Sequence, residues 1–183
     1  AGCHSANKGR QATFACSRNI PGSLGVGKIW GTPSGERLAE NTRKLADEGR
    51  IDPIDSLQSD HIYLFSGTHD HTVVPAIVDA AAEYYLRIGI PPGNIHYVKD
   101  VPAGHGFVTE DQGGACGDTG NTYIVHCNYD QAGDLLKTIY GRLNARAPQA
   151  LAAPEVFDHR PYTEGLSPHG LRAGGLVYVA ANS

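Results

Sequence analysis

Two residues with the chemistry of an acid–base pair follow two predicted strands of this chain. Asp70 lies in the segment SGTHDHTVVP, directly after the apolar run HIYLFSG, and His105 lies in VPAGHGFVTED, directly after IHYVKDV. A carboxylate that accepts the Nδ1–H of an imidazole fixes the tautomer of the ring and stabilises the imidazolium form. Nε2 can then take the proton of a hydroxyl nucleophile. We therefore expect Asp70 and His105 to be the acid and base of a catalytic triad.

Both residues also have other interpretations. Asp70 could cap the helix that follows it, or join His69 and His71 in a metal site, although neighbours in sequence rarely all reach one ion. His105, between two glycines, could belong to a solvent-exposed turn. Three other carboxylates are weaker candidates for the acid, because they neighbour the histidine in sequence: Asp100, Glu110 and Asp111.

The order of the predicted elements explains how the two side chains would meet. Apolar spacing, a possible N-cap at Ser34 and a stop at Gly49 predict a first helix. The elements that follow are a strand at residues 61–67, buried on both faces, a helix at 74–90, a strand at 95–101 and a helix at 129–146 capped near Asn128. This alternation predicts an α/β fold, a parallel sheet flanked by helices, with ligand sites at the carboxyl ends of its strands.

The chain divides in composition near residue 146. Residues 1–146 would form the Asp- and His-bearing part of a catalytic domain, with loop over residues 1–33. Residues 147–183 would form an Ala- and Pro-rich connection that ends in a strand of the same sheet, at residues 174–183. No internal repeat occurs.

The serine that a triad requires is not found in a suitable motif. A nucleophile elbow has the pattern G-x-S-x-G, which occurs nowhere in the 183 residues. Ser23, in PGSLG, has no strand before it, and Ser66, in FSGT, also lacks the pattern. In α/β-hydrolases the serine precedes the acid and the histidine, so we expect the elbow upstream of residue 1.

Charge and hydropathy exclude two classes of partner. The formal net charge is −4, 19% of the residues are charged, and no basic stripe of the kind that binds nucleic acid occurs. The apolar runs are too short to span a membrane.

The four cysteines form two pairs that are close in sequence, Cys3/Cys16 and Cys116/Cys127. Sequence alone allows three connectivities, of which the two local loops are the most economical. Zinc is an alternative, but no CxxC occurs and the spacing to His4 or His126 is not a familiar ligand pattern. Disulfides would indicate an oxidising compartment.

Several longer strings resemble the extracellular poly(3-hydroxybutyrate) depolymerases. They are RKLADEGRIDPIDSLQSDHIYLFSGTHDHTVVP, VPAGHGFVTED, ACGDTG with CNYDQAGDLLKTIYG, and LNAR, which follow one another in a consistent order over about residues 30–146. The tail HRPYTEGLSPHGLRAGGLVYVAANS resembles a connection in the circularly permuted, fungal-type members.

The resemblance implies a secreted (extracellular or periplasmic) serine esterase with an α/β-hydrolase fold and no cofactor or metal. Its substrate would be a polyester or a short-chain hydroxyalkanoate ester. Asp70 and His105 match the family's triad residues, Cys116 and Cys127 match a disulfide pair, and Cys3 and Cys16 a plausible second one. The chain departs from the family because the nucleophile elbow and the oxyanion-hole segment HGC are both absent from it, so the sheet would be incomplete and the chain alone inactive.

Two other functions compete with this interpretation. One is another secreted esterase, of the feruloyl, acetylxylan, tannase or cutinase type. The other is a non-catalytic secreted protein that binds a polymer through exposed aromatic side chains, for which the nine tyrosines are candidates.

Overall fold

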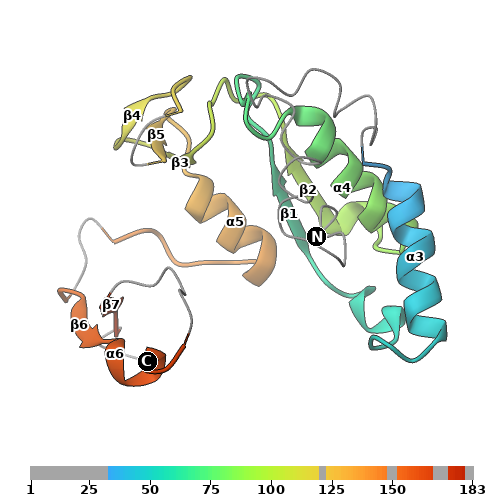
Figure 1. Ribbon diagram of the computed structural model, residues 1–183. Coiled ribbons are helices and arrows are strands. Elements are labelled where there is room, and N and C mark those ends of the chain that lie inside the picture. Colours follow the sequence, from blue (N-terminus) through green and yellow to red (C-terminus); the bar gives the residue numbers. More distant parts are fainter. Residues whose placement is uncertain (1–32, 120–122, 148–151, 167–172, 180–183) are drawn as a thin grey trace, which may run out of the picture. The chain divides into compact units, whose positions relative to one another are not determined.

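The computed structural model describes residues 33–119, 123–147, 152–166 and 173–179 (Figure 1). Cys3, Cys16, His4 and Ser23 lie outside these residues. The chain divides into two compact units between Leu143 and Asn144. No helix of the described segments is long and apolar enough to cross a membrane.

A parallel pair of strands forms the centre of the first unit, as predicted. Strand β1 (Ile62–Phe65) pairs with β2 (Ile95–Val98), and helix α4 (Pro75–Arg87) connects them beside the sheet (Figure 1). Single-turn 3₁₀ helices precede the strands: η1 (Ile54–Leu57) and η2 (Pro92–Asn94). All four β1 residues are half-buried, although we expected burial on both faces, because the described part of this sheet has two strands.

Helix α3 (Gly35–Asp47) packs against α4, as Figure 1 shows. The predicted N-cap is confirmed, since Ser34 Oγ accepts a hydrogen bond from Arg37 N–H at 3.3 Å. Gly35 lies so close to α4 that a Cβ atom there would be 2.6 Å from Tyr84 N and 2.7 Å from Ala80 O. The core cluster of this region is formed by the buried residues Ala39, Ile88 and Ile90.

A small sheet that the sequence analysis missed follows β2. It consists of β3 (Phe107–Thr109), β4 (Gly114–Ala115) and β5 (Ile124–His126), in the order β3-β5-β4 with both pairs parallel. Its fully buried side chains are Val108 and Val125, which pack with Ala103. The His105 loop is therefore continuous with a second core.

Helix α5 (Gln131–Tyr140) is shorter than predicted. Its N-cap is Asp130, whose carboxylate accepts a hydrogen bond from Gly133 N–H at 3.0 Å. The prediction of Asn128 as the cap was wrong, because that residue has a left-handed backbone with φ 54°. The helix ends where Gly141 adopts a positive φ of 75°, a conformation that favours glycine.

A polar network joins α5 to both central strands. The hydroxyl groups of Tyr63 and Tyr129 are 2.9 Å apart, Tyr129 donates to the Asp134 carboxylate, and His96 Nε2 lies 2.8 Å from Asp134 Oδ2. Burial alone would raise the pKa of Asp134, but the hydrogen bonds from Tyr129 and His96 outweigh it and lower that pKa. Burial and the Asp134 carboxylate raise the pKa of Tyr129. The network fixes α5 on the sheet in one orientation.

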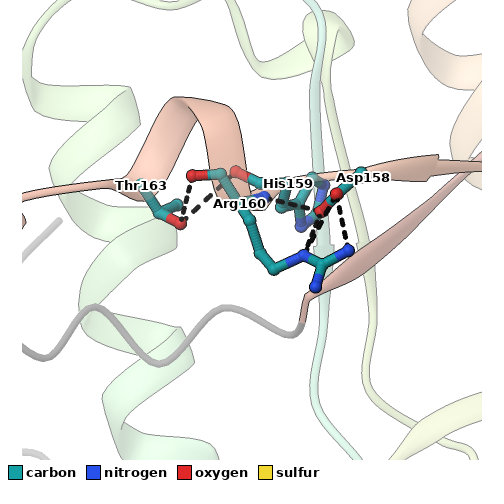
Figure 2. A network of polar contacts seen from close by, with 4 residues as sticks. All are labelled: Asp158, His159, Arg160 and Thr163. Carbon is teal, nitrogen blue, oxygen red and sulfur yellow. Dashed lines mark hydrogen bonds and ion pairs between the residues drawn. The ribbon is translucent and has the colours of Figure 1, made fainter.

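The second unit contains an antiparallel pair of strands, β6 (Glu155–Asp158) and β7 (Gly174–Val177), and the one-turn helix α6 (Arg160–Thr163). Figure 2 shows that Arg160 folds back on Asp158, with Nη2 2.8 Å from Oδ2, which lowers the pKa of that carboxyl. We expected a connection here and a terminal strand in the first sheet. Instead, β7 pairs with β6. The sequence analysis did not predict β6, because only two of its four residues, Val156 and Phe157, are apolar.

The close contact at Gly35 gives a test of the α3–α4 packing. We expect Gly35→Ala to lower the free energy of unfolding by about 2 kcal/mol, because the added methyl group meets backbone atoms that cannot move aside. Gly93→Ala is the matched control, since a Cβ atom there meets nothing within 4 Å. Urea denaturation of both variants measures the difference. A Gly35→Ala protein as stable as Gly93→Ala would contradict the packing.

Candidate active site

The pairing of β1 with β2 continues beyond the ends of the two strands. Thr68 N–H donates to Val101 C=O at 2.9 Å, and His69 N–H donates to Ala103 C=O at 3.1 Å. Gly67 makes this approach possible, because a Cβ atom at that position would lie 2.1 Å from the Ala103 carbonyl oxygen. The two loops that carry the predicted acid and base are therefore fixed to each other through their backbones.

Asp70 and His105 are in direct contact. The Nδ1 atom of His105 lies 3.0 Å from Asp70 Oδ2, and the side chains are 35% and 12% exposed, respectively. The other carboxylate oxygen, Oδ1, accepts hydrogen bonds from Thr72 N–H and Val73 N–H, both at 2.8 Å. Asp70 thus also holds a turn, but it does not cap the helix, whose N-cap is Val74.

This geometry determines what the imidazole can do. Asp70 Oδ2 accepts, so in the neutral ring the proton lies on Nδ1 and the lone pair is on Nε2. A ring in this tautomer takes up a proton at Nε2, and the adjacent carboxylate stabilises the resulting cation. The pair can therefore act as a general base and then as a general acid.

The loop of His105 is also held by the segment that follows β4. Gly104 N–H donates to Cys116 C=O at 2.7 Å, and His105 N–H donates to Thr119 Oγ1 at 3.3 Å. Gly104 leaves no room for a side chain, because a Cβ atom would lie 2.4 Å from the Asp118 carbonyl oxygen. A glycine at position 104 therefore allows the backbone of the His105 loop to lie against the backbone of Asp118.

A disulfide anchors the supporting segment. Cys116 and Cys127 are bonded, as predicted, and both pack against the second core. Closing a loop of this length stabilises a fold by about 3 kcal/mol in the chain-entropy model. The Cys3–Cys16 pairing stays a prediction, since both residues lie outside the described segments.

The sequence analysis missed one residue beside His105. The ring of Tyr123 lies edge-on to that of His105, with centroids 6.1 Å apart and an interplanar angle of 84°. Its carbonyl oxygen accepts a hydrogen bond from Phe107 N–H at 2.7 Å. The pairing of β3 with β5 brings Tyr123 close to His105. No pattern in the sequence predicted that pairing.

The alternative acids and nucleophiles are placed differently. Asp100, Glu110 and Asp111 are exposed, whereas Asp70 is the carboxylate bonded to the ring. Ser66 is 3% exposed and therefore not accessible to a substrate.

The described segments contain no group of three His, Cys, Asp or Glu side chains arranged to hold a metal ion. This includes His69 and His71, the neighbours of Asp70.

Comparison of the sequence with known proteins identifies two depolymerases as relatives. The chain is 38% identical over 157 residues to the poly(3-hydroxybutyrate) depolymerase of Delftia acidovorans, a match that covers 84% of this chain and 31% of that protein. It is 31% identical over 133 residues to the polyhydroxybutyrate depolymerase of Talaromyces funiculosus, covering 71% and 38%, respectively. The chain is a partial-length homologue of the poly(3-hydroxybutyrate) depolymerases. No protein-family model matches it.

Solved depolymerase structures share the fold. The crystal structure of the enzyme from Penicillium funiculosum matches with a TM-score of 0.67 at 26% identity, covering 91% of this chain and 52% of that one. A serine-to-alanine variant of a PHB depolymerase, complexed with an R3HB trimer, matches with a TM-score of 0.66 at 27% identity, covering 88% and 50%. The α/β-hydrolase type predicted from the sequence is thereby confirmed. The chain spans about a third of the curated relatives and about half of the solved structures.

The Asp70–His105 bond predicts the tautomer of the imidazole. We expect ¹⁵N NMR of the neutral ring to show the proton on Nδ1. Asp70→Asn should shift the population toward the Nε2–H tautomer, because an amide can present a donor to Nδ1. Asp100→Asn is the control and should leave the spectrum unchanged. An Nε2–H tautomer in the unaltered protein would contradict the contact.

Proposed function

We propose that this chain supplies the acid and base of an extracellular serine esterase that cleaves poly(3-hydroxybutyrate) or related hydroxyalkanoate esters. The observation that carries the proposal is the 3.0 Å contact between His105 Nδ1 and Asp70 Oδ2, at the carboxyl ends of neighbouring parallel strands. The homology to depolymerases supports the substrate class.

The reaction needs a serine from outside residues 1–183. Its hydroxyl oxygen attacks the ester carbonyl carbon while His105 Nε2 takes the hydroxyl proton, and Asp70 stabilises the imidazolium. The tetrahedral intermediate then breaks the carbon–oxygen bond of the ester, and His105 returns the proton to the departing alkoxide. A water molecule, deprotonated by the same nitrogen, releases the acid and restores the serine.

A solved relative supports the role of a serine as the nucleophile. In one matching structure the enzyme carries a serine-to-alanine substitution and holds an R3HB trimer, as expected if a serine is the nucleophile of that protein. In the proposed arrangement, residues 1–146 are the Asp- and His-bearing part of the catalytic domain, and residues 147–183 are a connection that carries the β6–β7 pair. The Cys116–Cys127 disulfide favours an extracellular or periplasmic location.

The decisive substitution is His105→Ala in the longer protein encoded by the extended reading frame. We expect kcat for a hydroxybutyrate oligomer to fall by at least about 10³-fold with little change in KM, because the residue acts mainly in the transition state. His61→Ala is the control, since this exposed histidine immediately precedes β1, at the end of the strand opposite to Asp70.

Other results would contradict parts of the proposal. Unchanged turnover in His105→Ala would remove the role of the base. Hydrolysis of feruloyl or acetylxylan esters but not of the oligomer would change the substrate class. Polyester binding without any hydrolysis would indicate a non-catalytic binding protein.

A further inference from the structure

An exposed aromatic ring lies next to the proposed base. Tyr123 is 58% exposed, and its ring is in edge contact with that of His105. The neighbouring β3 and β5 residues Phe107 and Ile124, which pair in register, are exposed as well. Tyr123 is thus one of three exposed apolar side chains on this part of β3 and β5, and its ring is the one in contact with the imidazole.

The backbone of Tyr123 is held in an unfavourable conformation. Its φ is 52°, in the left-handed region that aromatic residues seldom adopt. The carbonyl of the residue is fixed by Phe107 N–H, and a Cβ atom at Gly106 would lie 3.1 Å from it. Glycine would fit this conformation better, so the tyrosine costs stability and its ring is not required by the turn.

We propose that Tyr123 contacts the substrate and favours esters with an apolar alcohol portion. This inference rests on the proposed function. The base donates its proton to the departing oxygen, so a group beside its ring faces the alcohol side of the ester. In a polyhydroxyalkanoate that side is the next repeat unit, whose alkyl groups pack well against an aromatic surface. Tyr123 thus acts on specificity and not on the proton transfer.

Kinetics of the longer protein test this role. Tyr123→Ala should raise KM for a hydroxybutyrate oligomer by about 10-fold and leave kcat nearly unchanged, as for a contact made equally in ground state and transition state. KM for a methyl ester should change little, because its alcohol portion does not extend to the ring. Tyr123→Phe keeps the ring and should retain the original KM. Tyr140→Ala, at the exposed end of α5, is the matched control.

Thermal unfolding separates a substrate contact from a structural role. Tyr123→Gly should have a Tm equal to or above that of the unaltered protein, because the backbone strain is relieved, and yet raise KM for the oligomer as Tyr123→Ala does. Asn128→Gly relieves a similar φ of 54° at a residue outside the site and should leave KM unchanged.

The outcomes distinguish this inference from the proposed function. If the unaltered longer protein hydrolyses no ester, the proposed function fails. If it is active and KM for the oligomer is unchanged in both Tyr123→Ala and Tyr123→Gly, the inference is overturned and the function stands. A lower Tm in Tyr123→Gly, with kcat falling as in a partly unfolded enzyme, would likewise overturn it and assign the ring a structural role.

Discussion

The parallel pairing of β1 with β2 is the constraint on which the site depends. The ladder runs from Ile62 opposite Ile95 to the Ser66 N–H bond with Val98 C=O at 2.9 Å, and then continues between the two loops. Because the loops are hydrogen-bonded to each other, the positions of Asp70 and His105 are fixed relative to one another by the backbone. The backbone pairing sets the distance between the two residues, and the hydrogen bond between Asp70 and His105 orients the imidazole ring.

The second support of the base comes from the small sheet and its disulfide. Cys116, bonded to Cys127, accepts a hydrogen bond from Gly104 N–H and thereby holds the histidine loop. This support matters for the proposed triad, since a misplacement of about 1 Å at an active site can cost about 10²-fold in rate. The buried Val108 and Val125 form the core on which this support rests. Tyr123, whose ring contacts His105, has a positive φ of 52°, a conformation that aromatic residues seldom adopt.

Sequence reasoning succeeded where the signal was local and periodic. The β1–α4–β2 order, the Ser34 cap and the neighbouring positions of Asp70 and His105 follow from apolar runs, turn residues and the rule that parallel strands share a carboxyl edge. The strands β3, β4 and β5 have only two or three residues each, too few for any periodicity. Their pairing is non-local, so Tyr123 could not be placed near His105. Asn128 has the right side chain for a helix cap, but its backbone is left-handed.

The most direct test is to map the residue labelled by a serine-directed phosphonate in the protein expressed from the extended reading frame. Such a reagent modifies a serine only when a neighbouring base activates it. We expect a single labelled serine outside residues 1–183, and labelling that is lost in His105→Ala. Labelling at Ser23 or Ser66, or equal labelling rates with and without His105, would contradict the assignment of this chain as the acid–base half of an esterase.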